Sequence, residues 1–247
     1  MVLISKSQAP GARDLRVDSY IRNARIVIRM KKTYRQKYIF TAFFIILGLI
    51  ALQIPFTTLL GANVRFTLYD FIAPTLGTFL ASTPGILVVL VTQLLNYLIH
   101  PNSVTGIGSI IRLFPILFAV FYFSKKRTVN IAIPLLAMIV FNLHPIGRSA
   151  WAYSLLWLIP VFAHFFRKNL YIRSLGATFT AHSVGGALWV WTFGLSREMW
   201  LSLIPQSLME RALMAGGITV SYFALIKVFN FLKAKKLIHS FLYSPQS

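Results

Sequence analysis

Long runs of apolar residues without charges are the feature that most constrains this chain of 247 residues. Eight such runs follow one another, at 38–60, 66–81, 84–99, 109–123, 129–143, 149–166, 175–193 and 202–226. Helices of roughly 15 to 25 residues rise about 22 to 37 Å, which is comparable to the membrane hydrocarbon core of about 30 Å. Only 12% of the residues are charged, against about a quarter in soluble domains, so an ordinary soluble domain is excluded. We expect an all-α, polytopic transmembrane bundle of six to eight spans.

The range of six to eight spans arises because residues 66–99 can be read in two ways. One straight helix over this range would be about 50 Å long, too long for a single span. The sequence Ser82-Thr83-Pro84-Gly85 is a strong helix breaker in its middle. We therefore expect a helical hairpin, which either crosses the membrane twice or enters and returns on the same side. Both alternatives leave the direction of every later span unchanged.

The distribution of basic residues predicts the orientation. The net charge of +20 would indicate a nucleic-acid partner on a soluble protein, but basic residues beside apolar runs indicate topology instead. With the N-terminus inside, 20 of the 25 Lys and Arg residues lie in cytoplasmic segments. We expect a multi-pass protein of the inner or plasma membrane with both termini in the cytoplasm, anionic lipids as partners at the inner leaflet, and no nucleic-acid partner.

The chain divides by charge into three parts. Residues 1–37 form a basic cytoplasmic segment in which Arg22, Arg25, Arg29 and Lys32 follow helical spacing, which predicts an interfacial helix. This helix either lies on lipid or docks a cytoplasmic partner, and composition does not separate the two. Residues 38–230 form the transmembrane bundle, and residues 231–247 form a second basic cytoplasmic tail.

Polar side chains within the apolar runs are the candidate functional residues, because ionisable groups at membrane depth are costly. With the predicted topology they gather in the outer half of the bundle, over an apolar inner half, which describes a pocket that opens outward. In this pocket, aromatic side chains would stack on a ring of the bound solute, and charged side chains would orient the solute. The candidate lining residues are Asn96, Arg112, Asn142, His182, Trp189, Glu210 and Arg211. His182 as a helix-to-helix hydrogen bonder and Glu210 in a buried ion pair with Arg112 or Arg148 remain structural alternatives.

Several kinds of chemistry have no signature in the chain. It contains no cysteine, no nucleophile elbow, no zinc-protease helix and no paired aspartate motif. His182 and Ser183 are adjacent and so point about 100° apart on a helix, which gives no evidence of a dyad. His100, His144 and His182 lack diagnostic metal spacing. We expect no enzyme activity, no cofactor and no bound metal.

The stretch 70–90, DFIAPTLGTFLASTPGILVVL, resembles the second-to-third helix region of S components, the vitamin-binding membrane subunits of energy-coupling-factor transporters. Chain size and basic flanks are similar as well. The resemblance implies uptake of a small, vitamin-like solute together with a coupling ATPase module. Family members usually have six spans, and their first helix often has an Ala-x-x-x-Ala face that the spacing of Ala42, Gly48 and Ala51 does not reproduce.

These observations predict a transport protein that binds a small ring-bearing solute from the outer face. The alternative is a structural or assembly subunit without transport, in which the same polar residues hold helices together and the basic N-terminus docks another subunit. A cavity lined by the candidate residues favours the first hypothesis, and pairing of Glu210 and His182 between helices favours the second.

Overall fold

The computed structural model describes residues 38–58, 65–101 and 106–235, so the predicted interfacial helix and most of the C-terminal tail lie outside the described residues. The described residues from 41 to 235 belong to one compact unit. Regular structure in the described ranges is helical apart from one antiparallel ladder between β1 (Pro55–Thr58) and β2 (Arg65–Thr67). The prediction of an all-α protein is therefore confirmed in its coarse form.

Among the described residues, three helices are long and apolar enough to cross a membrane. They are α4 (Ser82–Ile99), the helical stretch Ile107–Ser124 formed by α5 (Ile107–Ile111) and α6 (Leu113–Ser124), and α12 (Arg197–Ala234). Large apolar side chains on these helices are exposed, with Leu98 at 78% and Val220 at 69%. Such surfaces suit a lipid environment rather than water. The chain is thus a helical membrane protein.

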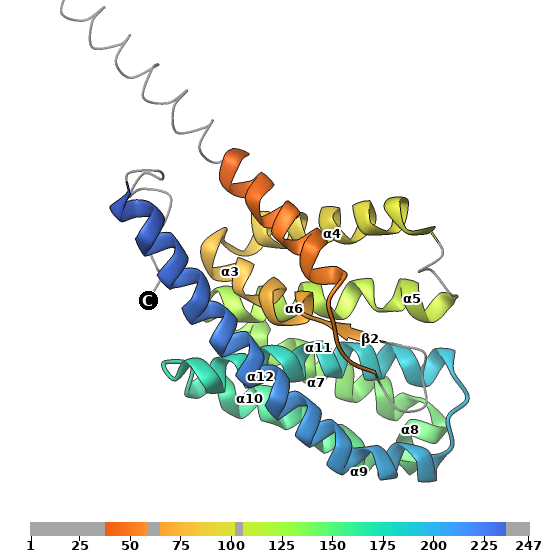
Figure 1. Ribbon diagram of the computed structural model, residues 1–247. Coiled ribbons are helices and arrows are strands. Elements are labelled where there is room, and N and C mark those ends of the chain that lie inside the picture. The colour runs from red at the N-terminus through yellow and green to blue at the C-terminus, as the bar shows by residue number, and fades with distance from the viewer. Residues whose placement is uncertain (1–37, 59–64, 102–105, 236–247) are drawn as a thin grey trace, which may run out of the picture. The chain divides into compact units, whose positions relative to one another are not determined.

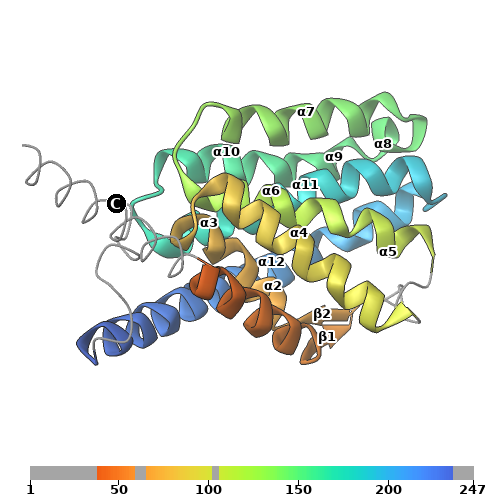
Figure 2. The same ribbon diagram turned by 90° about the horizontal axis from the view of Figure 1, so that it is seen from above.

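Shorter apolar helices complete the bundle. They are the helix Tyr38–Leu52, α7 (Val129–Leu143) and the run Trp151–Phe165, which consists of α9 (Trp151–Ser154), η3 (Leu155–Trp157) and α10 (Leu158–Phe165). The short helix α8 (Pro145–Ser149) connects α7 to this run. The helix between this run and α12 is α11 (Leu170–Thr192). It packs against α6, α7, α10 and α12 and so lies in the middle of the bundle (Figures 1 and 2).

Side-chain caps fix where the two longest helices begin. The Asn169 side chain accepts a hydrogen bond from the Ile172 N–H at 3.1 Å at the start of α11. The Ser196 hydroxyl accepts one from the Met199 N–H at 3.3 Å at the start of α12. Such caps satisfy amide groups that have no partner in the first helical turn. At its other end α12 runs to Ala234, past the boundary expected at residue 230.

The structure differs from the expected helix over 66–81. After β2 the chain forms three short pieces, α2 (Tyr69–Ile72), η1 (Ala73–Thr75) and α3 (Leu76–Phe79). Every residue from 71 to 79 is buried. Broken helical backbone at membrane depth is tolerated where protein covers it, and α4, α6 and α12 pack against this segment. The segment therefore serves as part of the interior instead of a lipid-facing helix.

The junction between this segment and α4 requires an unusual backbone conformation. Ala81 has φ 69° and ψ 172°, a region that residues other than glycine rarely adopt. Close packing on either side holds it in place. A Cβ at Gly77 of α3 would lie only 2.2 Å from the Val120 carbonyl oxygen of α6, so glycine is required there.

Glycines of α11 and α12 lie where other parts of the chain approach these helices closely. Gly176 of α11 lies against the Tyr122 ring, and Gly186 of the same helix lies against Trp157. Gly217 of α12 lies against the Phe71 ring in the same way. Small residues let helices and rings approach closely in membrane bundles.

Hydrogen bonds define the two ends of the bundle. Ser82 at the start of α4 bonds Ser124 at the end of α6, with the two hydroxyl oxygens 2.6 Å apart. At the opposite end, the Arg197 side chain of α12 donates to the Ser149 carbonyl of α8 at 3.0 Å. The first end also carries a group of exposed cations, namely Lys125, Lys126, Arg127, Lys168, Lys227, Lys233 and Lys235. We call these the basic end and the Arg197 end.

Candidate functional site

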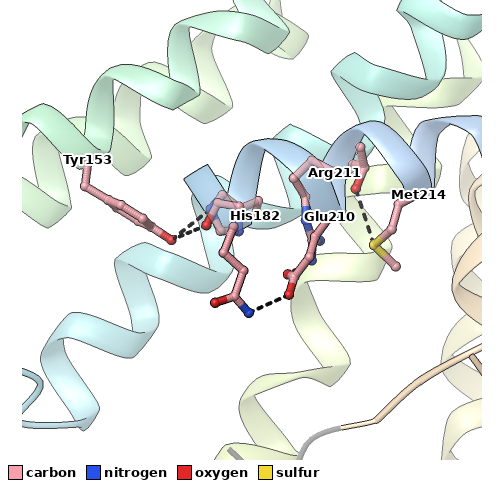
Figure 3. A network of polar contacts seen from close by, with 8 residues as sticks. Tyr153, His182, Glu210, Arg211 and Met214 are labelled. Carbon is pink, nitrogen blue, oxygen red and sulfur yellow. Dashed lines mark hydrogen bonds and ion pairs between the residues drawn. The ribbon is translucent and has the colours of Figure 1, made fainter. Parts of the chain in front are cut away.

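A charged cluster in the interior of the bundle is centred on Arg211 of α12. Arg211 is only 6% exposed, and the neighbouring Glu210 places a carboxylate oxygen 3.5 Å from its guanidinium. The amide of Gln206, one turn earlier, donates to the other Glu210 oxygen at 2.8 Å. The ion pair that the structure describes for Glu210 is with Arg211 of its own helix, whereas the structural alternative considered from the sequence was a pair with Arg112 or Arg148 (Figure 3). Both oxygens of Glu210 are held by its own helix.

The ring of Phe66 joins Arg211 to the second arginine of the cluster. The guanidinium carbon of Arg211 lies 4.9 Å from the centre of this ring, and that of Arg112 lies 5.6 Å from it. Phe66 belongs to β2, and Arg112 lies between α5 and α6. Cation–π contacts of this kind gain strength where water is excluded. The cluster therefore draws on segments far apart in the sequence.

Asp70 of α2 supplies the second carboxylate. Its Oδ2 accepts hydrogen bonds from the Thr67 N–H at 2.7 Å and from the Thr67 hydroxyl at 3.3 Å. The positive charges of Arg112 and Arg211 both act on this carboxylate. Two arginines and two acids give the cluster a formal charge of zero, which reduces the cost of placing four ionisable groups in an apolar bundle.

His182 takes part in an adjacent network that links three helices. The Tyr153 hydroxyl of α9 lies 3.0 Å from His182 Nε2 on α11 and 3.1 Å from the Ser207 hydroxyl on α12. Figure 3 shows the Tyr153 ring directed at His182, with Glu210 and Arg211 nearby on α12. The Ser183 hydroxyl donates to the Thr180 carbonyl of its own helix at 2.8 Å, so it forms no dyad with His182.

Aromatic rings surround this network on several sides. His182 has the rings of Tyr153, Trp157 and Phe179 at 5.7, 6.5 and 6.0 Å between centroids. Trp200 contacts the other face of the network, 4.9 Å from the Tyr153 ring. These aromatic side chains therefore form an apolar region next to the charged cluster.

The remaining predicted lining residues lie elsewhere. The Asn142 side chain donates to the Met138 carbonyl at 2.8 Å and to the Ser154 hydroxyl at 3.0 Å, and so joins α7 to α9. Trp189 packs on Phe193, with ring centroids 4.2 Å apart. Asn96 accepts a hydrogen bond from the exposed Gln53 side chain at 2.8 Å. The structure therefore brings together His182, Glu210 and Arg211, connects Arg112 to them through Phe66, and separates the other three.

Five contributors were not among the predicted lining residues, namely Phe66, Asp70, Tyr153, Gln206 and Ser207. A signal existed for two of them. Asp70 is one of three acidic residues after the N-terminal segment, and Gln206 precedes Glu210 by one helical turn. An aromatic residue within an apolar run, such as Tyr153, carries no comparable signal.

A second polar cluster lies toward the basic end and ties helices together. Arg173 of α11 donates through Nε to the Phe123 carbonyl of α6 at 2.8 Å, and its guanidinium also contacts the Thr78 hydroxyl of α3. Arg167, in the connection between α10 and α11, lies over the Tyr122 ring at 4.8 Å. Burial lowers the pKa of Arg167, and the Tyr122 contact opposes this effect. The hydrogen-bond partners of Arg173 are backbone and side-chain groups of the protein itself, which is typical of a structural role.

The chemistry open to the Arg211 cluster is recognition by charge and hydrogen bonding. Among the described residues no group of three or more His, Asp or Glu side chains is placed to hold a metal ion. No protein-family model, no curated protein and no solved structure matches this chain.

Proposed function

We propose that the protein is a multi-pass transport protein that binds a small, ring-bearing solute from the outer face for uptake, in the manner of an S component. The observation that carries the proposal is Arg211, a buried arginine inside an apolar membrane bundle. Ionisable residues at this depth are costly and by default mark a functional site. Apolar side chains of similar size would stabilise the bundle at least as well as an ion pair, so stability alone gives little reason for the cluster.

The position of the cluster supports access from the Arg197 end. Arg211 lies nearer to the start of α12 at Arg197, 14 residues away, than to its end at Ala234, 23 residues away. Around the buried Arg211 are four residues of intermediate exposure, Phe66, Asp70, Arg112 and Glu210, and the Glu210 side chain is 16% exposed. Partly exposed polar groups around a buried one are the pattern expected at the mouth of a binding site.

The basic end supports a cytoplasmic placement of the opposite side. Its exposed cations have no acidic residue beside them in sequence, and basic residues collect on the cytoplasmic side of membrane proteins. With this orientation the Arg211 cluster opens outward. Anionic lipids at the inner leaflet, and a coupling or ATPase module or another membrane subunit, are the partners that we propose for the basic end.

One observation favours the second candidate function, a structural subunit that assembles with a partner. The Tyr153 hydroxyl joins His182 to Ser207, and Asn142 joins α7 to α9, so part of the polar set holds helices together. Glu210, in contrast, bonds only within its own helix among the contacts described. Glu210 therefore adds no helix-to-helix pairing among these contacts.

Native mass spectrometry of the protein purified without added ligand tests the proposal. We expect a small molecule bound at close to one per chain in the wild type and in Arg148→Gln, which alters an exposed arginine outside the cluster. Arg211→Gln removes the buried guanidinium and should lower the occupancy several-fold. A wild type that carries lipid alone, or an occupancy equal in all three proteins, contradicts solute binding at this cluster.

A further inference from the structure

Hydrogen-bond donors around Arg211 lack partners, and this imbalance indicates what the site binds. Arg211 is more than nine-tenths buried, yet its Nε has no hydrogen-bond partner among the described residues. Its contact with Glu210 is long, at 3.5 Å. A buried donor without a partner costs free energy, so a group that accepts from it would be bound favourably.

The acceptors of the cluster are better satisfied than its donors. Glu210 Oε1 accepts from Gln206 at 2.8 Å, and Asp70 Oδ2 accepts from the Thr67 N–H at 2.7 Å. The neighbouring aromatic network also contains buried hydrogen-bond donors without partners. The indole N–H groups of Trp157 and Trp200 are buried and have no hydrogen-bond partner in the described ranges. The unmet hydrogen bonds near the site are therefore mostly donors, which favours a ligand rich in acceptors.

The contact between Arg211 and Phe66 leaves a defined direction for such a ligand. The Phe66 ring lies 4.9 Å from the guanidinium carbon. Stacking on an aromatic ring uses the face of a guanidinium, whereas its N–H bonds lie in the guanidinium plane. Nε and a terminal nitrogen of the same edge match the two oxygens of a carboxylate. A planar anionic group in that plane would meet the Nε that now lacks a partner.

We infer that the solute carries a carboxylate, which Arg211 binds through its Nε edge beside Phe66. This inference rests on the proposed solute-binding function and narrows its ligand to ring-bearing organic acids. The charge of the cluster favours a carboxylate over a phosphate. Asp70, Glu210, Arg112 and Arg211 sum to a formal charge of zero, so a carboxylate adds one negative charge to the site, whereas a phosphate monoester adds up to two.

The test uses the molecule released from the purified wild-type protein by denaturation. Treatment of this molecule with acidic methanol adds one methyl group for every carboxylate, which mass spectrometry detects. Wild-type protein stripped of the molecule is then titrated in detergent with the released acid and with its methyl ester. We expect the ester to bind about ten-fold to a hundred-fold more weakly, the range for a lost hydrogen-bonded charge.

Two variants separate loss of the carboxylate contact from poor fit of the ester. In Arg211→Gln the ratio of ester to acid dissociation constants should fall close to one, whereas Arg148→Gln should keep the wild-type ratio. If Arg211→Gln does not fold, the wild-type comparison of acid and ester still decides the matter.

Each other outcome has a distinct meaning. A released molecule that methanol does not esterify, or that carries a phosphate in place of a carboxylate, overturns the inference and leaves solute binding intact. An ester that binds as tightly as the acid overturns it as well. If the wild type releases no small molecule, the proposed function fails, and the inference fails with it.

Discussion

Gly217 offers a sharp test of the packing that positions the charged cluster. At this residue α12 lies against the ring of Phe71, which directly follows Asp70. A methyl group at Gly217 would lie 2.7 Å from Cδ1 and Cγ of Phe71, well inside van der Waals contact, and the ring is buried. At the preceding Gly216 a methyl group would have no heavy atom within 4 Å. The two glycines therefore form a matched pair on one helix.

The expected difference follows from two contributions. Replacing glycine by alanine inside a helix is favourable by about 1 kcal/mol, and this gain is shared by Gly216→Ala and Gly217→Ala. Only Gly217→Ala also overpacks a buried ring, which costs about 1–3 kcal/mol. Because the helix term cancels in the comparison, Gly217→Ala should be less stable than Gly216→Ala by about 1–3 kcal/mol.

Thermal unfolding of both variants in the same detergent measures this difference. For a chain of this size, 1 kcal/mol corresponds to a shift of about 2–4 °C in Tm. Gly217→Ala should therefore melt about 2–12 °C below Gly216→Ala. Equal melting temperatures would refute the packing of α2 on α12, and with it the placement of Asp70 beside Arg211.

Three further variants test other parts of the structure. Ala81→Gly should raise the free energy of unfolding by about 1 kcal/mol, because glycine adopts the positive φ of this junction without strain; a lower Tm would contradict the backbone described there. Arg173→Leu should lower stability by about 1–3 kcal/mol, since it leaves a buried carbonyl unsatisfied, whereas Lys126→Leu at an exposed site should change little in chemical denaturation. Tyr153→Phe should cost about 1–2 kcal/mol in the same assay by removing the hydroxyl that links α9 to α11 and α12, and no measurable loss would show that this link is unimportant.

Hydrophobic runs predicted helices well where the whole helix is apolar. The run at 129–143 coincides with α7, and the run at 84–99 begins two residues inside α4. The predicted bounds of α11 and α12 were too narrow because both helices extend through charged residues. Arg173 lies within α11, where protein groups of α3 and α6 satisfy it. A charge ends an apolar run without ending the helix.

The broken segment between β2 and α4 was harder to predict. Its apolar composition is that of a membrane span, and its breaks depend on the close approach of Gly77 to α6 and on the conformation of Ala81. Both are properties of tertiary packing. The candidate site was likewise only partly predictable. The rarity of charged residues in the bundle indicated Glu210 and Arg211, whereas the contacts of Phe66 with Arg112 and Arg211 depend on tertiary packing.

The most direct test of solute binding at the Arg211 cluster is an experimental structure of the protein purified from its own membrane without added ligand. We expect density for a small molecule in contact with the Arg211 guanidinium and beside the Phe66 ring. Continuous side-chain packing around Arg211, with its Nε bonded to a protein group and no small molecule nearby, would contradict solute binding at this cluster and would favour the structural function.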